Sequence, residues 1–191
     1  MPLHPTSQAQ HAIGALVGSA VGDELGALQE LARGLLGHNP VPFTPSDDEG
    51  GPTRVHGDVP LHAADLTGAS KAPADWAVVS LCRTGGAFAR HAVRREVFLI
   101  DQYEEHDNAN PRAALADAVA TIDALLAEDP ARPVVVHCHG GRSRTGFVLK
   151  AWAMRRHGWS EAEAHAWLLR SWGRVHRNNP VFTRVLREEW R

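Results

Sequence analysis

The ten residues from His137 to Gly146 constrain this chain more than any other stretch. They read His-Cys-His-Gly-Gly-Arg-Ser-Arg-Thr-Gly and lie between an apolar run, 133–136, and a segment rich in helix formers, 147–156. The β-branched run predicts a buried strand, and the second segment predicts a helix with one apolar face. The loop between them therefore contains a helix N-terminus. Its unpaired backbone N–H groups and the positive end of the helix dipole favour the binding of an anion there.

The loop also carries side chains suited to chemistry on such an anion. Cys138 lies where the helix dipole and neighbouring cations stabilise a thiolate, which is the nucleophilic form of cysteine. Arg144 offers a planar, permanently charged fork that can bind two oxygens of a phosphate. Gly140 and Gly141 allow successive N–H groups to turn inward. These residues together predict a nucleophile beside a bound oxyanion.

Two further residues complete the predicted site. Thr145 is positioned to donate its hydroxyl to the sulfur when that sulfur leaves, and His137 to hold the loop through hydrogen bonds of its ring. The chemistry requires no metal or other cofactor. The residues expected to surround the substrate are His137, His139, Gly140, Gly141, Arg142 and Ser143.

The string from Val136 to Gly146 resembles the HC-x5-R-[ST]-G signature of the cysteine-dependent protein tyrosine phosphatases, and most closely their dual-specificity branch. The resemblance implies hydrolysis of phosphate monoesters through a phosphocysteine, with Cys138 as nucleophile and Arg144 as phosphate ligand. No Gly-Lys-Ser/Thr closes the loop, so it is not a nucleotide P-loop. Rhodanese-like sulfur transferases and arsenate reductases are rivals that the string resembles poorly. The intact cysteine and arginine argue against a non-catalytic phosphate-binding module.

A phosphatase also needs an acid to protonate the leaving oxygen, and two aspartates are candidates. Residues 96–100 predict a strand, and Asp101 follows it directly. Asp107 lies on the same polar loop, 31 positions before Cys138, whereas Asp101 lies 37 positions before it. In the phosphatases that the chain resembles, the acid lies at a similar distance ahead of the cysteine, on a mobile loop. The stretch 103–108 also resembles the acid loop of the lipid-phosphatase branch, so we favour Asp107 and keep Asp101 as the alternative.

The substrate class is the least constrained prediction. The chain has nothing that resembles the long phosphotyrosine-recognition loop of the classical branch, so we expect a shallow pocket that admits phosphoserine and phosphothreonine as well as phosphotyrosine. His139 and Arg142 occupy loop positions where the lipid-phosphatase branch has lysines. Their positive charge would suit an inositol phosphate or phosphoinositide. A phosphorylated protein is the first expectation, and a small multiply phosphorylated molecule is the alternative.

Cys82 has two interpretations. An isolated cysteine at a strand end is ordinarily an inert, buried thiol. The stretch Ser80-Leu81-Cys82, however, resembles the strand end where lipid and some dual-specificity phosphatases hold a second cysteine beside the catalytic one. That resemblance implies a redox partner, which traps the oxidised Cys138 as a reversible disulfide.

Composition limits the other options. A chain of 191 residues with 43% hydrophobic content can bury one good core and an appendage. A formal net charge of −2 gives no reason to expect a nucleic acid partner. Two cysteines make no disulfide framework and favour the reducing cytoplasm. The apolar run within 12–21 is too short to span a bilayer and lacks a basic leader, so we expect neither a membrane span nor a signal peptide.

Residues 14–27 have a pattern of their own. Glycine recurs at every fourth position from Gly14 to Gly26, which would line one helix face. The stretch resembles the opening helix of ADP-ribosylglycohydrolases, enzymes that bind two magnesium ions through several aspartate clusters. Only one acidic group, 47–49, is near. We therefore expect residues 1–34 to be a helical extension similar to a fragment of that family, too short for its activity.

The remaining patterns predict an α/β domain. Residues 35–60, rich in proline and glycine, are expected to form a linker, and residues 61–191 the phosphatase domain. Regular elements are expected from Trp76 onward. Strands are expected at 76–81, 96–100 and 133–136, and helices are expected to begin at Asn110, Ser160 and Asn179. Strands interleaved with helices predict a central, mostly parallel twisted sheet flanked by helices, with the active loop at a strand's carboxyl end.

Overall fold

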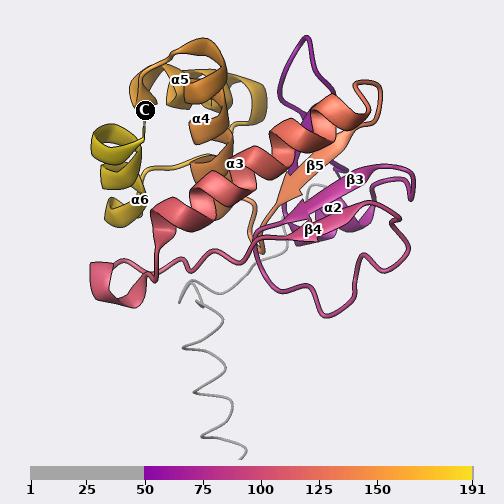
Figure 1. Ribbon diagram of the computed structural model, residues 1–191, viewed down its shortest axis with the longest axis horizontal. Coiled ribbons are helices and arrows are strands. Elements are labelled where there is room, and N and C mark those ends of the chain that lie inside the picture. Colours follow the sequence, from indigo (N-terminus) through magenta and orange to yellow (C-terminus); the bar gives the residue numbers. More distant parts are fainter. Residues whose placement is uncertain (1–49, 191) are drawn as a thin grey trace, which may run out of the picture. The chain divides into compact units, whose positions relative to one another are not determined.

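The computed structural model describes residues 50–190, and a five-stranded sheet forms the centre of this part (Figure 1). The strands are β1 (Thr53–Arg54), β2 (Leu61–Ala64), β3 (Ala77–Ser80), β4 (Arg94–Glu96) and β5 (Val134–His137). Their order is β1-β2-β5-β3-β4. Only the β1–β2 pair is antiparallel, and the other three pairs are parallel. The predicted α/β architecture with a mostly parallel sheet is confirmed.

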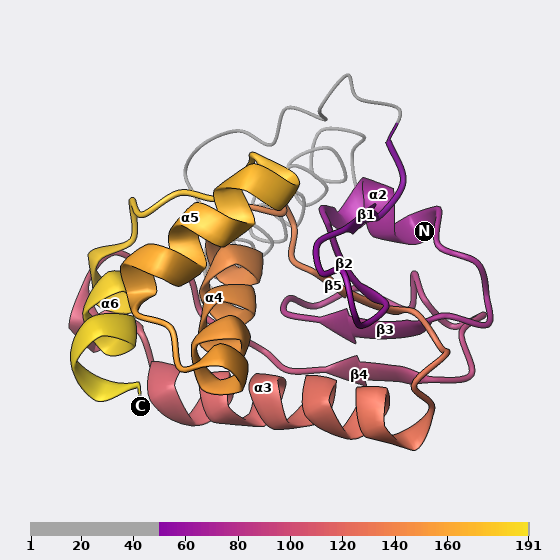
Figure 2. The same ribbon diagram turned by 90° about the horizontal axis from the view of Figure 1, so that it is seen from above.

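Helices cover both faces of this sheet. They are α2 (Leu66–Ser70), the short 3₁₀ turn η1 (Glu105–Asp107), α3 (Pro111–Glu128), α4 (Ser143–His157), α5 (Glu161–Trp172), α6 (Pro180–Arg184) and the π-helical turn η2 (Val185–Glu189). Figure 2 shows α3 along one side of the strands and α2 on the other. Helix α4 directly follows β5 and contacts both α3 and α5.

Alternation along the strands fills two cores. Val134 and Val136 belong to the larger core, which includes side chains of α3, α4 and α5. Val135, between them, belongs to a smaller core with Ala69 and Phe88. Successive strand side chains point to opposite faces, so both faces of β5 are buried. This burial fixes the central strand, which leads into the loop 138–142.

The predicted helix starts at Asn110, Ser160 and Asn179 are confirmed. Gly158 ends α4 in the left-handed conformation, with a φ of 69°. Ser160 and Glu163 form a reciprocal capping box at the start of α5. The side chain of Asn179 caps α6. Asn110 occupies the N-cap position of α3 as expected, but its backbone is left-handed at φ 50° and ψ 52° and its side chain makes no capping hydrogen bond.

Two boundaries predicted from the sequence are wrong. The strand expected at 96–100 is β4 at Arg94–Glu96. The expectation rested on the alternating apolar residues Val97 and Leu99, and these are apolar because they are buried in the core beyond the end of the ladder. Regular structure also starts before Trp76, with β1, β2 and α2. Residues 53–54 of the expected linker pair with β2 and so belong to the sheet.

The helical extension expected at 1–34, with its resemblance to ADP-ribosylglycohydrolases, lies outside the described residues. So does most of the expected linker, 35–60. Within residues 50–190, no helix is long and apolar enough to cross a membrane.

Candidate active site

The loop that follows β5 places the cysteine and an arginine at the N-terminus of α4. Cys138 comes directly after β5, and Arg144 is the second residue of α4. Both are almost fully buried, at 2% and 5% exposure. Parallel strands β2, β5 and β3 end at this edge of the sheet, and the first N–H groups of α4 have no acceptor within the helix. The loop can therefore bind an anion where a nucleophile and a fixed cation are both at hand.

Close packing against the chain after β2 fixes the path of this loop. Gly141 has a φ of +63°, and a Cβ there would lie 2.8 Å from Asp65 N and 2.9 Å from Ala64 O. His139 O accepts a hydrogen bond of 3.1 Å from Leu66 N. Only glycine fits at position 141 without displacing backbone, because the atoms that a Cβ would meet are main-chain atoms.

His137 supports the loop from the core. Its Nε2 lies 2.7 Å from Ser80 Oγ, and its Nδ1 lies 3.4 Å from Cys138 O. Burial lowers the pKa of His137 to about 4, so the ring is neutral near pH 7. A carbonyl beside Nδ1 favours the single ring proton on that nitrogen, and Nε2 then accepts a hydrogen bond from the Ser80 hydroxyl. The imidazole thus links the end of β5 to β3.

Asp101 contacts the arginine of the loop. Its Oδ2 lies 3.6 Å from Arg144 Nε, while its Oδ1 accepts hydrogen bonds of 2.8 Å from Ser143 Oγ and 2.9 Å from Asn179 Nδ2. All three contacts use Asp101 as an acceptor or an anion. This arrangement suits a carboxylate that orients the guanidinium.

Asp107 has a different environment. It is the last residue of η1, and its side chain is 52% exposed. Within the described part of the chain, its carboxylate has one ionic neighbour, His106 at 3.5 Å. The structure therefore brings Asp101, and not Asp107, into contact with the loop residues Ser143 and Arg144.

Donors without a partner remain around the cysteine. Among the described residues, Arg144 Nε and Thr145 Oγ1 are buried without a hydrogen-bond partner. Arg144 also donates to Leu99 O at a long 3.4 Å. Buried donors are normally satisfied, so these groups have capacity for a ligand or for the sulfur.

Cys82 lies close enough to the site for charges there to act on it. Burial raises the pKa of the Cys82 thiol to about 12, and the charge of Arg144 opposes part of that rise. Cys82 and Cys138 are both free and buried. Cys82 is thus a protonated thiol near the loop.

Basic side chains from two segments lie near the loop. His139 and Arg142 are exposed. Burial lowers the pKa of His176, on which the charges of Asp101 and Arg142 act in opposite directions. Arg174 donates to Asp65 Oδ2 at 2.7 Å. Arg142 thus carries a fixed positive charge on the loop itself, whereas Arg174 is paired with Asp65 and the lowered pKa of His176 favours its neutral form.

Comparison with known proteins agrees with this geometry. The model of the family "dual specificity phosphatase, catalytic domain" matches residues 77–190, which cover β3 to η2. The chain belongs to the dual specificity phosphatase family. The match contains Cys138, Arg144 and both candidate acids, so every part of the site except the Asp65 region lies within the family domain.

A curated relative of this dual specificity phosphatase is the protein-tyrosine-phosphatase IBR5 of Arabidopsis thaliana. The two are 44% identical over 52 residues, which cover 27% of this chain. The match spans only 20% of the length of that relative. This comparison supports the protein tyrosine phosphatase class for the aligned segment.

Solved structures give the same fold. Human DUSP28 is 24% identical, with a TM-score of 0.58 over 76% of this chain and 93% of the other. A mouse putative dual specificity phosphatase complexed with zinc tungstate is 19% identical, with a TM-score of 0.60 over 75% of this chain and 89% of the other. The comparisons together support a cysteine-dependent protein tyrosine or dual-specificity phosphatase, which is a phosphoric monoester hydrolase.

Two residues of this site were not predicted from the sequence. Asp65, 6% exposed, follows β2 and packs its backbone against Gly141. Asn179, expected only as a helix cap, also donates to Asp101. Recognition of β2 as a strand parallel to β5 would have pointed to Asp65, because the ends of parallel strands meet at one edge.

Proposed function

We propose that the chain hydrolyses phosphate monoesters in two steps through a phosphocysteine. The sulfur of Cys138 forms a bond to phosphorus as the ester P–O bond breaks, and the leaving oxygen takes a proton from a carboxylic acid. Water then attacks phosphorus, the S–P bond breaks, and the carboxylate takes the proton of the water. The observation that carries the proposal is the joint burial of Cys138 and Arg144 at the N-terminus of α4.

Arg144 and the backbone N–H groups of residues 139–144 bind the three non-bridging oxygens in this proposal. The Nε of Arg144, which faces Asp101 but has no hydrogen-bond partner in the described chain, supports that role. Thr145 Oγ1 donates a hydrogen bond to the sulfur when the sulfur leaves in the second step. This role is supported because Thr145 Oγ1 is buried without another hydrogen-bond partner in the described chain. His137, held by Ser80, keeps the carbonyl of Cys138 in place.

We assign the general acid to Asp107 and the orientation of Arg144 to Asp101. Asp101 accepts from Ser143 and Asn179 and faces the guanidinium, so its oxygens are already engaged. Asp107 is on an exposed turn and has one weak neighbour, so its carboxyl is available to a substrate. An acid on a separate segment fits a loop that closes when a substrate binds.

The proposed substrate is a phosphorylated protein, with phosphotyrosine and phosphoserine or phosphothreonine as the reacting groups. A small multiply phosphorylated molecule is the second candidate. Arg142 favours it, because this exposed guanidinium of the loop has no ionic or hydrogen-bond partner in the described chain and could bind a second phosphate. Hydrolysis of phosphotyrosyl peptides and of inositol polyphosphates by the wild type and by Arg142→Ala separates the two.

Cys82 is proposed as a redox partner of Cys138. When peroxide converts the Cys138 thiolate to a sulfenic acid, the Cys82 thiol condenses with it, so that a disulfide forms and water leaves. Peptide mapping without reductant after mild peroxide treatment tests this step. A nucleophilic cysteine with a second free cysteine nearby also suits a reducing compartment, and we propose the cytoplasm.

The proposed activity is tested by turnover of p-nitrophenyl phosphate. We expect Cys138→Ser to lose turnover but to retain binding of tungstate. Cys82→Ser, a change at the other buried free cysteine, is the matched control and should retain turnover. Turnover that survives in Cys138→Ser would overturn the proposal.

A further inference from the structure

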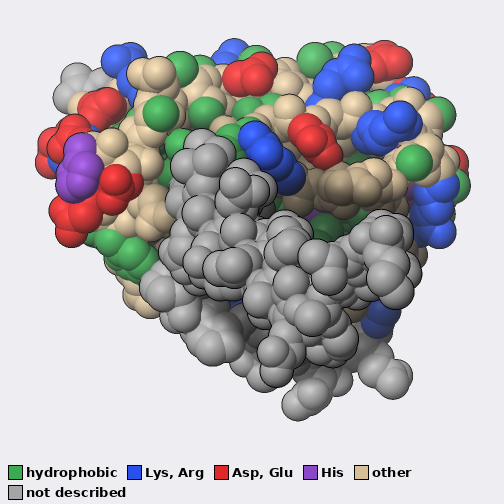
Figure 3. All heavy atoms as spheres, turned by 90° about the horizontal axis from the view of Figure 1, so that it is seen from below, with side chains coloured by type: hydrophobic (Ala, Val, Ile, Leu, Met, Phe, Trp, Pro, Cys, Tyr) green, Lys and Arg blue, Asp and Glu red, His purple; other side chains and the backbone are tan. Residues whose placement is uncertain are grey.

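The turn that carries Asp107 is poorly packed onto the domain. None of the three residues of η1 is buried. Figure 3 shows acidic side chains gathered around a histidine at the left edge of the molecule, the edge at which Figure 1 places η1. Polar contacts, and not apolar ones, must therefore hold this turn in place.

The base of the segment is held by a side chain of its own. Asn108, 6% exposed, donates to Gln102 O at 2.6 Å and to Glu104 O at 2.8 Å. Asn179 also donates to Gln102 O, at 3.0 Å. These bonds fix residues 102–104 but leave the turn itself without support from another element.

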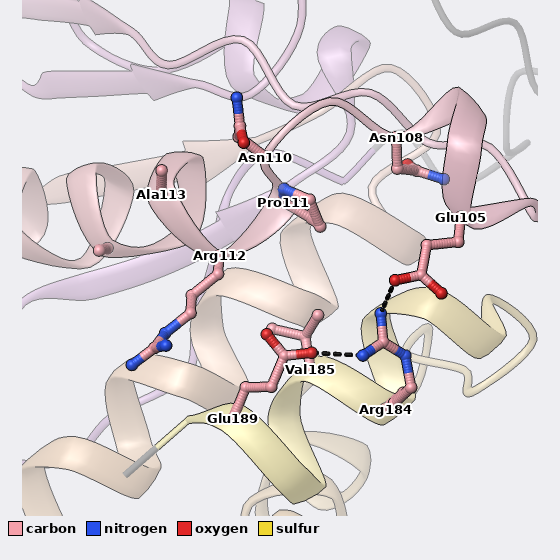
Figure 4. A pocket seen from close by; sticks show the side chains of 10 residues that line it. Glu105, Asn108, Asn110, Pro111, Arg112, Ala113, Arg184, Val185 and Glu189 are labelled. Carbon is pink, nitrogen blue, oxygen red and sulfur yellow. Dashed lines mark hydrogen bonds and ion pairs between the residues drawn. The ribbon is translucent and has the colours of Figure 1, made fainter.

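Arg184 of α6 supplies the support that the turn lacks. Its Nη2 donates to Glu105 Oε1 at 2.7 Å. In the described part of the chain, this is the one side-chain hydrogen bond from η1 to another helix or strand. Its Nη1 donates to Glu189, so the guanidinium lies between two carboxylates (Figure 4).

A cavity of about 640 Å³ lies beside this ion pair. Glu105, Asn108, Pro111, Arg112, Arg184 and Val185 are among the residues that line it, and they come from η1, the start of α3 and the C-terminal helices. None of the residues of η1 belongs to the apolar cores of the described chain. The hydrogen bond of Arg184 with Glu105 is therefore the side-chain contact that ties η1 to α6.

A left-handed residue stands at the end of the same segment. Asn110, between η1 and α3, is the one described non-glycine residue with a positive φ, at 50°. Asparagine adopts this conformation more readily than other non-glycine residues, and here it turns the chain into α3. The segment is thus bounded by the anchored Asp101 and by a joint at Asn110.

We propose that Arg184 is a positioning residue for the general acid, through its ion pair with Glu105. The guanidinium holds η1, and with it Asp107, within reach of the loop when the segment closes on a substrate. This inference rests on the proposed function and on the assignment of the acid to Asp107. Arg184 itself touches no reacting atom in this proposal.

The test is the dependence of the first chemical step on the leaving group. Protonation matters more for phenyl phosphate than for p-nitrophenyl phosphate, whose phenolate is a stable leaving group. We expect Arg184→Gln to slow phosphocysteine formation from phenyl phosphate in single-turnover experiments by about two- to fivefold, the range for an exposed ion pair. The rate with p-nitrophenyl phosphate should change less. Glu105→Gln should give the same result, and the double variant should be no slower than either single variant.

Arg112→Gln is the matched control, because this arginine lines the same cavity and has no ionic partner in the described chain. It should change neither rate. The proposal is overturned if Arg184→Gln slows both substrates equally, or slows neither, while Asp107→Asn shows the selective loss. If Asp107→Asn shows no selective loss, the acid assignment fails and this inference fails with it. If the turnover of the wild type does not depend on Cys138, the proposed function itself fails.

Discussion

Replacement of Gly141 by alanine tests the close packing of the candidate phosphate loop. The backbone at φ +63° would cost a non-glycine residue about 1–2 kcal/mol. The added Cβ would also meet main-chain atoms of Ala64 and Asp65 at 2.8–2.9 Å, and an overpacked site costs about 1–3 kcal/mol. The sum is about 2–5 kcal/mol of unfolding free energy if the loop stays in place.

The loop can also relieve the contact by moving, and the cost then appears as lost activity. A misplacement of about 1 Å at a reacting centre lowers the rate by about 100-fold. Urea unfolding, kcat/KM for p-nitrophenyl phosphate and the Kd for tungstate together measure both costs. Gly140→Ala is the control for stability, because a Cβ there meets nothing within 4 Å and its φ is not positive. The argument is refuted if Gly141→Ala has wild-type values in all three measurements.

Three further predictions follow from burial and charge. Burial holds the pKa of His137 at about 4, whereas it is about 6.5 in the unfolded chain, so on acidification the unfolded state binds the proton first. The domain should therefore lose up to about 3 kcal/mol of unfolding free energy as the pH falls from 6.5 to 4. In urea unfolding over this range, the unfolding free energy of His137→Asn should depend less steeply on pH than that of the wild type, and an equal pH dependence would contradict this prediction. Glu161→Gln should destabilise the domain by about 3–5 kcal/mol in thermal unfolding, because the buried Lys150 loses the charge of its partner, whose Oε1 lies 3.1 Å from its Nζ. Glu188 is exposed, so Glu188→Gln should change the stability by less than about 0.5 kcal/mol in the same assay. Asp107→Asn should slow phenyl phosphate hydrolysis by about 100- to 10,000-fold, and p-nitrophenyl phosphate hydrolysis by less, while Asp101→Asn slows both alike; the reverse pattern would assign the acid to Asp101.

The strand, loop and helix around Cys138 could be predicted because their signals are local. Four consecutive residues, 134–137, are buried in the central strand, and the glycine and arginine spacing lies within one loop. Capping residues such as Ser160 are also local, since their side chains bond to the first turn of their own helix. Signals of this kind can be recognised within a short stretch of sequence, because the residues that interact are close together in the chain.

Contacts between distant segments could not be predicted in this way. β2 is a run of four residues, Leu-His-Ala-Ala, with no polar alternation, and it becomes a strand through its ladder with β5. Asp65 was missed for that reason. The hydrogen bond between Asp101 and Asn179 joins residues 78 positions apart, so sequence spacing alone gave no sign that the first aspartate is engaged.

The central claim of this account is that Cys138 becomes covalently phosphorylated while Arg144 holds the phosphate. It is tested most directly by rapid acid quench of the reaction with p-nitrophenyl phosphate, followed by mass spectrometry of the peptides. We expect phosphate on the peptide that contains Cys138 in the wild type and none in Cys138→Ser, while Arg144→Met shows weakened tungstate binding. Phosphate on another residue, or full turnover without any phosphorylated peptide, would contradict the account.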